Sequence, residues 1–259
     1  MILLAVAFLV SLLPPIGLFL WLRQVEGDAE FKGICNRALL QGAITALPVA
    51  GCSMLFVIAE YGLSRIGLSG ISKVAYHEII AIALAEELCK YLMFRQLLKK
   101  YDRAWSWADY IILMTIVGIG FGILEDFFYI AGSDAITMIV RGVTCMHGGY
   151  GFIMGYFLGK GQKTGNKGWT VAGLALPWLL HGAYDFGLSE EFLALSDNAA
   201  FLPVSLAIFA LVTLVVMIVL FIRHKNDERY MAPMAPLPEA GQAPESTMAV
   251  ETKLATETA

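Results

Sequence analysis

The sequence predicts an all-α, polytopic membrane protein with about seven transmembrane helices, and its composition and apolar runs are the observations that predict it. Of the 259 residues, 58% are hydrophobic, and the mean hydropathy is +0.68. Soluble domains are only roughly 45–50% apolar. Charged residues make up 15% of the chain and lie mostly in short clusters between apolar runs. Because one soluble core of this length cannot bury so much apolar surface, we expect lipid to solvate much of it.

Apolar stretches of about 20 residues, the length that a bilayer-spanning helix requires, recur along the chain. The first has no basic segment before it and no small-residue cleavage site, so we expect an uncleaved helix that Pro14 and Pro15 kink. Together the stretches predict a transmembrane domain over residues 1–222. The predicted spans are 1–22, 38–60, 74–98, 108–131, 135–159, 168–188 and 199–222.

Basic residues lie mostly on one side of this predicted domain. The opposite side has only Arg65 and Lys73. Because cytoplasmic loops carry the excess of Lys and Arg, we expect the N-terminus outside and the C-terminus in the cytoplasm. Eukaryotic sorting signals are absent, which favours the inner membrane of a bacterium. The basic residues on the predicted cytoplasmic side are Arg23, Lys32, Arg37, Lys99, Lys100, Arg103, Lys160, Lys163, Lys167, Arg223, Lys225 and Arg229.

The segment after the last predicted span has a different composition. Residues 223–259 are rich in Pro, Ala, Glu and Thr and have no aromatic residue after Tyr230. Such a segment cannot bury enough apolar area to offset chain entropy, so we predict a disordered cytoplasmic tail. The net charge of −4 gives no basic face for nucleic acid. No CxxC pair occurs among the four cysteines, which argues against a disulfide framework or a zinc knuckle.

Ionisable residues inside four consecutive predicted spans are the strongest functional signal. A charge in the middle of a spanning helix costs about 2.5–3.5 kcal/mol on insertion scales. Because these residues are confined to spans three to six, we expect them to share one polar cavity between those helices. We expect this cavity to be a catalytic site. The residues deep in the spans are Glu86, Glu87 and Lys90 in span three, Glu125 and Asp126 in span four, Arg141 and His147 in span five, and His181 and Asp185 in span six; His77 and Glu78 lie nearer the outer end of span three.

Helical spacing predicts how these residues pair. Glu86 and Lys90 are i,i+4 neighbours and share a helix face, as do His181 and Asp185. A carboxylate one turn from an imidazole fixes its tautomer and raises its basicity. Arg141 lies at the depth of the two acids of span four, so we expect it to pair with one of them. Glycines crowd the same helices and should let them approach closely.

Glutamates and histidines on separate helices support two related chemistries. In one, a zinc-like ion held by His and Glu activates water while a second glutamate acts as the base. If a metal is present, we assign Glu125, His147 and His181 as its ligands. In the other, a buried glutamate takes a proton from water and histidines stabilise the oxyanion. No HExxH zinc motif occurs in the chain.

The order of these motifs resembles the PrsW family of intramembrane proteases, distant relatives of the CAAX-prenyl endopeptidases. Glu86-Glu87-Leu-Cys-Lys90 matches EExxK, Phe121-Gly-Ile-Leu-Glu125 matches FxxxE, and the Arg141/His147 span and His181-Gly-Ala-Tyr-Asp185 follow. The match covers roughly residues 74–188. The resemblance implies an endopeptidase whose substrates are membrane proteins, with anti-sigma factors among the known bacterial ones, and we expect a single-span substrate.

The resemblance also implies roles for individual residues. The expected catalytic residues are Glu86, Glu87, Glu125, His147 and His181, and Lys90, Asp126, Arg141 and Asp185 are expected to support them. The family is labelled metallopeptidase, whereas better-understood relatives resemble glutamate-dependent enzymes, so zinc and metal-free mechanisms both stay open.

Other functions would also place charges inside a membrane. A proton- or ion-coupled transporter uses such residues, but the chain shows no paired halves or inverted repeat. A haem-binding membrane protein could use His147 and His181 as axial ligands, but this leaves the acids unexplained. An inactive scaffold that keeps its polar core for assembly is a third alternative.

Overall fold

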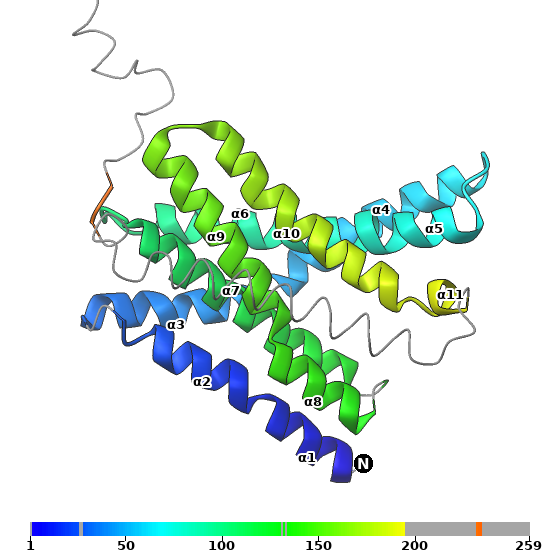
Figure 1. Ribbon diagram of the computed structural model, residues 1–259, viewed down its shortest axis with the longest axis horizontal. Helices are drawn as coiled ribbons and strands as arrows, with labels where there is room; N and C mark the ends of the chain where they lie inside the picture. Colours follow the sequence, from blue (N-terminus) through cyan, green and yellow to red (C-terminus); the bar gives the residue numbers. More distant parts are fainter. Residues whose placement is uncertain (1, 26–27, 131, 133, 195–231, 235–259) are drawn as a thin grey trace, which may run out of the picture.

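The structure, a computed structural model, is built of helices joined by short connections in the residues that it describes, 2–25, 28–130, 132, 134–194 and 232–234 (Figure 1). No β-strand occurs in these ranges, so the expectation of an all-α protein is confirmed for them. The seventh predicted span, 199–222, lies outside the described residues. Of the predicted tail, the structure describes only residues 232–234.

The first predicted span consists of two helices, α1 (Ile2–Ser11) and α2 (Leu13–Leu22). They meet at Leu12, two residues before Pro14 and Pro15. Proline at the first positions of a helix is tolerated because those N–H groups have no partner within the helix. The expected kink is therefore present, as a break just before the prolines.

The second predicted span is longer in the structure than its apolar core. It consists of α3 (Ala29–Ile44) and α4 (Ala46–Ser64), which meet at Thr45. The helix begins at residue 29 and not 38, because Asp28 caps it: its carboxylate accepts a hydrogen bond of 2.6 Å from the backbone N–H of Phe31. Hydropathy alone does not predict that the helix begins with such a polar first turn.

The third predicted span, 74–98, is not a uniform α-helix. It consists of α5 (Gly70–Tyr76), the π-helix η1 (His77–Leu84) and α6 (Ala85–Lys99). In a π-helix each N–H bonds to a more distant carbonyl than in an α-helix, so the residues that follow are rotated relative to a regular α-helix. The segment immediately after η1 carries Glu86 and Glu87, and π-helical turns are frequent at functional sites.

The remaining helices begin with α7 (Trp107–Tyr129), which starts at a capping box formed by Ser106 and Asp109. Then come α8 (Ala135–Thr144) and α9 (Met146–Thr164), which divide the fifth predicted span at Cys145. The sixth span is α10 (Lys167–Leu188), and the short α11 (Glu190–Leu193) follows it.

Helix α7 lies at the centre and packs against α3 and α9 (Figure 1). Glycines make these contacts close: a Cβ at Gly118 would collide with the backbone of His147, and one at Gly120 with the backbone of Leu39. The hydrophobic core collects buried side chains of α2, α3, α6, α7 and α9. The expected role of the glycines in helix packing is confirmed at these positions.

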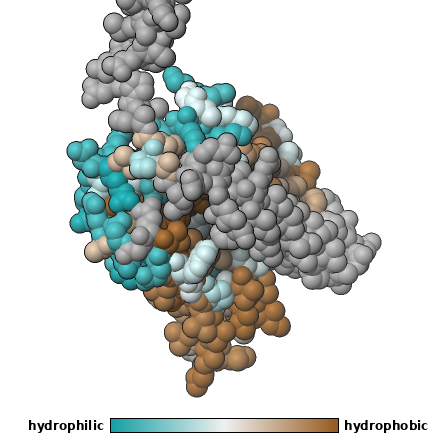
Figure 2. All heavy atoms as spheres, turned by 60° about the vertical axis from the view of Figure 1, so that its left-hand side comes forward, coloured by the Kyte–Doolittle hydropathy of each residue, from teal (hydrophilic) through white to brown (hydrophobic). Residues whose placement is uncertain are grey.

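Within the described residues, three helical stretches are long and apolar enough to cross a membrane: Ile2–Leu22, Ala29–Ser64 and Trp107–Tyr129. The last is 61% buried in its most apolar part, against 22% and 11% for the other two. Large apolar side chains are therefore exposed on α1 and α4, among them Ile2, Leu47 and Leu55. Hydrophobic side chains cover the lower part of the face in Figure 2 and hydrophilic ones gather at its upper left, as a membrane-embedded bundle requires.

Candidate active site

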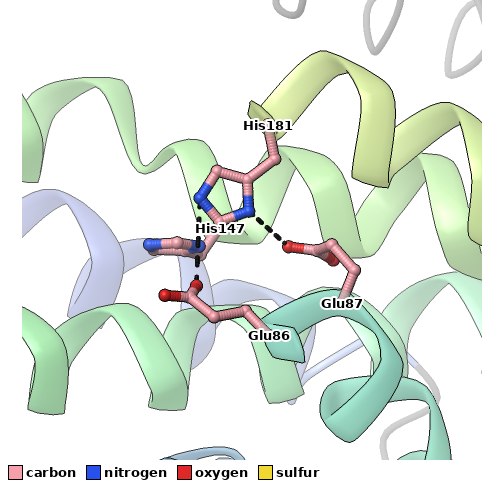
Figure 3. A group of neighbouring side chains, drawn as sticks. All are labelled: Glu86, Glu87, His147 and His181. Carbon is pink, nitrogen blue, oxygen red and sulfur yellow. Dashed lines mark hydrogen bonds and ion pairs between the residues drawn. The ribbon is translucent and has the colours of Figure 1, made fainter. Parts of the chain in front are cut away.

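Four ionisable side chains from three helices meet inside the molecule (Figure 3). Glu86 and Glu87 lie in the first turn of α6, His147 in the first turn of α9, and His181 in the second half of α10. One nitrogen or oxygen atom from each lies within 4.8 Å of the others. A buried charge is costly unless it is paired and hydrogen-bonded, so the partners of these groups decide what the cluster can do.

One part of the cluster, which we call the buried half, consists of Glu86, Glu87, Lys90 and His181. Lys90 is its cation. The Lys90 Nζ atom lies 2.7 Å from Glu87 Oε1 and 3.4 Å from Glu86 Oε2, and its side chain is 0% exposed. The ammonium also lies over the ring of Phe121, 4.2 Å from its centroid. The expected pairing of Glu86 with Lys90 is confirmed, and Glu87 shares the same ammonium.

Both ring nitrogens of His181 contact carboxylates. Nδ1 lies 3.0 Å from Glu87 Oε1, and Nε2 lies 3.1 Å from Asp185 Oδ2 and 3.8 Å from Glu86 Oε2. The expected contact between His181 and Asp185 is therefore confirmed. Acids on both sides fix the orientation of the ring.

A second group, which we call the pocket half, consists of Glu125, Asp126 and Arg141. Arg141 Nε donates to Asp126 Oδ1 at 2.6 Å, and Arg141 Nη2 donates to Glu125 Oε2 at 2.9 Å. These side chains are 12–23% exposed, whereas those of the buried half are 0–8% exposed. Arg141 was expected to pair with one of the two acids, and it pairs with both.

His147 joins the two halves. Its Nδ1 lies 2.9 Å from Lys90 Nζ, and its Nε2 lies 2.5 Å from Glu125 Oε2. Since an ammonium group only donates hydrogen bonds, Nδ1 is the acceptor and Nε2 carries the proton that is donated to Glu125. The imidazole thereby connects Lys90 to Glu125 through one continuous chain of hydrogen bonds.

A break in the fifth span aims Arg141 and His147 at the same oxygen. Residues six positions apart on a continuous α-helix differ by about 240° in direction, which would turn these two side chains away from each other. Cys145 interrupts the helix with a left-handed backbone, φ 45° and ψ 45°. A non-glycine residue in this conformation is uncommon and strained. The strain lies directly beside the residue that joins the two halves.

The π-helix η1 positions the buried half from the other side. The indole N–H of Trp178 on α10 donates a hydrogen bond of 2.6 Å to the carbonyl oxygen of Ile79 in η1. Gly182 lies so close to Ile79 that a Cβ at Gly182 would collide with its Cα. Trp178, His181 and Gly182 thus place α10 tightly against the segment that leads into Glu86 and Glu87.

A pocket of about 50 Å³ lies beside the cluster, and its lining includes Glu125, Asp126, Arg141, His147, Tyr150 and His181. This volume has room for water. Two buried polar atoms have no hydrogen-bond partner among the described residues: Oη of Tyr150, which lines the pocket, and Oε2 of Glu87, whose other oxygen contacts His181. An unpaired buried acceptor is unusual and is expected where a ligand, ion or water binds.

The structure therefore brings together all five expected catalytic residues and their four expected supporting residues. Among the described residues, the set that could hold a metal is Glu86, Glu87, His147 and His181, whereas the ligands expected from the sequence were Glu125 and the two histidines. Glu125 is instead bonded to His147 and Arg141. Tyr150 was not among the site residues expected from the sequence. Its position about one helical turn after His147 is the feature that could have indicated it.

His77 and Lys73, near the start of η1, form ion pairs outside this cluster. His77 Nδ1 lies 2.8 Å from Glu60 Oε2, and Lys73 Nζ lies 3.8 Å from Glu60 Oε1. His77 is 41% exposed at its side chain. These residues form a separate ion-pair group near the C-terminal end of α4 and the start of η1.

Comparison with known proteins places the chain in a family. A family model described as PrsW family intramembrane metalloprotease matches residues 32–222. The chain belongs to the PrsW family. Protease PrsW of Oceanobacillus iheyensis is 29% identical over 178 residues, which cover 67% of this chain and 78% of that relative. Protease PrsW of Bacillus subtilis is 28% identical over 168 residues, 62% of this chain and 72% of the relative.

A third PrsW protease, from Clostridioides difficile, is 26% identical over 197 residues, which cover 71% of this chain and 80% of the relative. No solved structure gives a significant match to the chain. PrsW membership confirms the resemblance drawn from the motifs, the expectation of a peptide hydrolase, and a membrane setting. It also separates the protein from the transporter and haem-protein alternatives.

Proposed function

We propose that this protein is an endopeptidase that hydrolyses peptide bonds of membrane proteins at the cluster formed by Glu86, Glu87, Glu125, His147 and His181. The observation that carries the proposal is the convergence of two glutamates and two histidines within 4.8 Å. These residues come from helices far apart in the sequence of a protein of a protease family. Peptide hydrolysis needs a group that takes a proton from water and groups that stabilise the charge formed on the carbonyl oxygen.

Glu87 is the proposed general base. Its Oε1 is held by Lys90 Nζ at 2.7 Å and by His181 Nδ1 at 3.0 Å, while its Oε2 has no partner among the described residues. The unpaired oxygen can accept the proton of an attacking water molecule. Positioned proton transfer of this kind contributes roughly 10²–10⁴-fold to a rate. His181 and Asp185 hold the base in place, and Glu125 holds His147.

The residues present fit a metal ion in the chemistry of their donors. Carboxylate oxygens and imidazole nitrogens are zinc ligands, and Glu86, Glu87, His147 and His181 would hold the ion. Bound there, zinc would supply a Lewis acid that activates water. One feature opposes it: the ammonium of Lys90 already lies within hydrogen-bond distance of Glu86, Glu87 and His147. Lys90 is thus the positive charge of the cluster in a metal-free mechanism.

The proposed membrane arrangement has seven spans over residues 1–222, with the N-terminus outside and a cytoplasmic tail from residue 223, in the inner membrane of a bacterium. Contacts between predicted cytoplasmic loops support it. Arg103, after the third span, lies 3.6 Å from Asp28, after the first span. Lys99 and Lys167, from the loops after spans three and five, line one pocket. We propose a single-span membrane protein, of the anti-sigma-factor kind, as substrate.

The test uses full-length protein in detergent or liposomes with a single-span reporter substrate. Glu87→Gln and His181→Ala should abolish cleavage without loss of folded protein. His77→Ala is the matched control, since His77 lies in the separate ion-pair group with Glu60, and it should cleave as the wild type does. Unchanged cleavage by both cluster variants would refute the proposed function.

A metal assay on active protein separates the two mechanisms. One zinc per chain, with cleavage lost on chelation and restored by zinc, selects the metal mechanism. Full cleavage by metal-free protein selects the mechanism in which Lys90 is the cation. Lys90→Met supplies an independent readout, because removing the ammonium should raise the zinc content of the protein only if the metal and the ammonium compete for the same acids.

A further inference from the structure

Tyr150 has a buried hydroxyl group that no part of the proposed mechanism uses. The residue is 1% exposed, and its Oη has no hydrogen-bond partner among the described residues. Buried tyrosine hydroxyls usually find a partner, and one left without it is destabilising. A phenylalanine would fill the same volume without this cost, so the hydroxyl calls for an explanation beyond packing.

The ring of Tyr150 is fixed by both histidines of the site. It stacks on His181 with the centroids 5.0 Å apart and an interplanar angle of 23°, and it meets His147 at 6.1 Å and 76°. Tyr150 also lines the pocket that Glu125, His147 and His181 line. Phe121 packs on His147 in a similar way, 5.0 Å away at 80°. Packing against these imidazoles thus does not itself require a hydroxyl.

The donors of the two histidines and of Lys90 already have protein partners. Both nitrogens of His181 face carboxylates, and those of His147 face Lys90 and Glu125. The Lys90 ammonium is shared among Glu86, Glu87 and His147. A substrate carbonyl that enters the pocket would therefore find the histidines committed and the Tyr150 hydroxyl uncommitted.

We infer that the Tyr150 hydroxyl donates a hydrogen bond to the carbonyl oxygen of the scissile peptide and stabilises the negative charge that forms there, an inference that rests on the proposed protease function. The oxygen of a water molecule bonds to the carbonyl carbon, one water proton passes to the Glu87 carboxylate, and the π electrons of the carbonyl move to its oxygen. Tyr150 keeps its proton throughout. When the carbonyl re-forms, the C–N bond breaks and the proton held by Glu87 goes to the leaving amine.

Tyr150→Phe tests this role because it removes the hydroxyl and keeps the stacked ring. Loss of one oxyanion donor lowers kcat by about 10²–10³-fold, and we expect this loss with KM changed by less than about threefold and an unfolding midpoint no lower than that of the wild type. Tyr110→Phe, in α7 where its ring packs on Phe94, is the control and should leave kcat unchanged. An unchanged kcat in Tyr150→Phe would overturn the inference.

A second measurement uses binding in place of turnover. A peptide phosphonate that mimics the tetrahedral intermediate should bind Tyr150→Phe more weakly than the wild type by the same factor as the loss in kcat. Uncleaved substrate should bind equally to Glu87→Gln with and without the Tyr150 change. Equal phosphonate affinity would refute the role of Tyr150 while wild-type cleavage still supports the protease. Absence of wild-type cleavage would instead refute the proposed function.

Discussion

The two halves of the charge cluster contain the same balance of charge in different surroundings. In the buried half, Lys90 faces Glu86 and Glu87, and in the pocket half, Arg141 faces Glu125 and Asp126. Each half thus pairs one cation with two acids. The side chains of the buried half are at most 8% exposed, whereas those of the pocket half reach 23%.

This difference in exposure indicates which half is suited to catalysis and which to holding the helices together. A guanidinium that bonds two acids at 2.6 and 2.9 Å satisfies the pocket half. The buried half keeps a carboxylate oxygen, Glu87 Oε2, away from bulk water and without a partner in the described part of the chain. Low-dielectric surroundings strengthen the interactions of such a group with a reacting molecule. We therefore expect the two halves to respond differently when each loses its cation.

The largest effect should come from removing those cations. Lys90→Met leaves two buried carboxylates without a counter-ion and should lower the free energy of unfolding by about 3–5 kcal/mol. Arg141→Met should lower it by about 1–3 kcal/mol, because water reaches the acids that it leaves behind. Denaturant unfolding in detergent, followed by near-ultraviolet circular dichroism, measures both.

Lys99→Met is the matched control for these variants. Lys99 lies in the last turn of α6, is exposed and lies outside both halves, so its loss should change stability by no more than about 0.5 kcal/mol. If Lys90→Met and Arg141→Met cost the same, burial does not distinguish the halves and the comparison fails.

The acids of the pocket half should also differ from each other in their effect on cleavage. Glu125 accepts hydrogen bonds from both Arg141 and His147, whereas Asp126 accepts from Arg141. Glu125→Gln should lower kcat by about 10–100-fold, as loss of a group that orients a site histidine typically does. Asp126→Asn should lower it by less than about threefold. Steady-state cleavage of the reporter substrate gives both values, and equal losses would show that Glu125 acts only as a partner of Arg141.

Much of this cluster could be predicted from the sequence. A charge inside an apolar helix must find a partner, and helical spacing restricts the choice. Spacing and depth therefore predict the pairs Glu86 with Lys90, His181 with Asp185, and Arg141 with an acid of the fourth span. The boundaries of α7 and α10 also follow their apolar runs closely, 107–129 against the predicted 108–131 and 167–188 against 168–188.

The contacts that join the helices could not be predicted in the same way. His147 is 57 residues from Lys90, and His181 is 94 residues from Glu87. Their meeting depends on how the helices rotate about their axes, and two departures from α-helical geometry set that rotation. The η1 sequence HEIIAIAL reads as an ordinary apolar helix. Cys145 has a left-handed backbone although the residue is not glycine. The amino-acid composition therefore predicts neither the π-helix nor the break at Cys145.

The contribution of each irregular backbone segment to the half beside it can be tested by mutation. The first of these segments is the left-handed residue Cys145, beside the pocket half. Cys145→Gly should keep stability and cleavage at or above the wild-type level, because glycine adopts φ 45° without strain. Cys145→Val should lower the free energy of unfolding by about 1–2 kcal/mol or more and reduce cleavage, because a β-branched residue disfavours that conformation. Cys52→Val, within the regular helix α4, controls for the change of side chain. Equal behaviour of the Gly and Val variants would mean that the break is not strained.

The smallest effect should come from Trp178, beside the buried half. Trp178→Phe removes the hydrogen bond to the Ile79 carbonyl and should cost about 0.5–1.5 kcal/mol of unfolding free energy. The residue does not touch the charged atoms, so kcat should fall by less than about tenfold, through a small displacement of His181 from Glu87. Trp169 lies near the start of α10, where its indole stacks on Phe157. The control variant Trp169→Phe should leave kcat unchanged. If both variants cleave equally, the π-helix is held without the indole; if only Trp178→Phe loses kcat, the geometry of the buried half depends on this contact between α10 and η1.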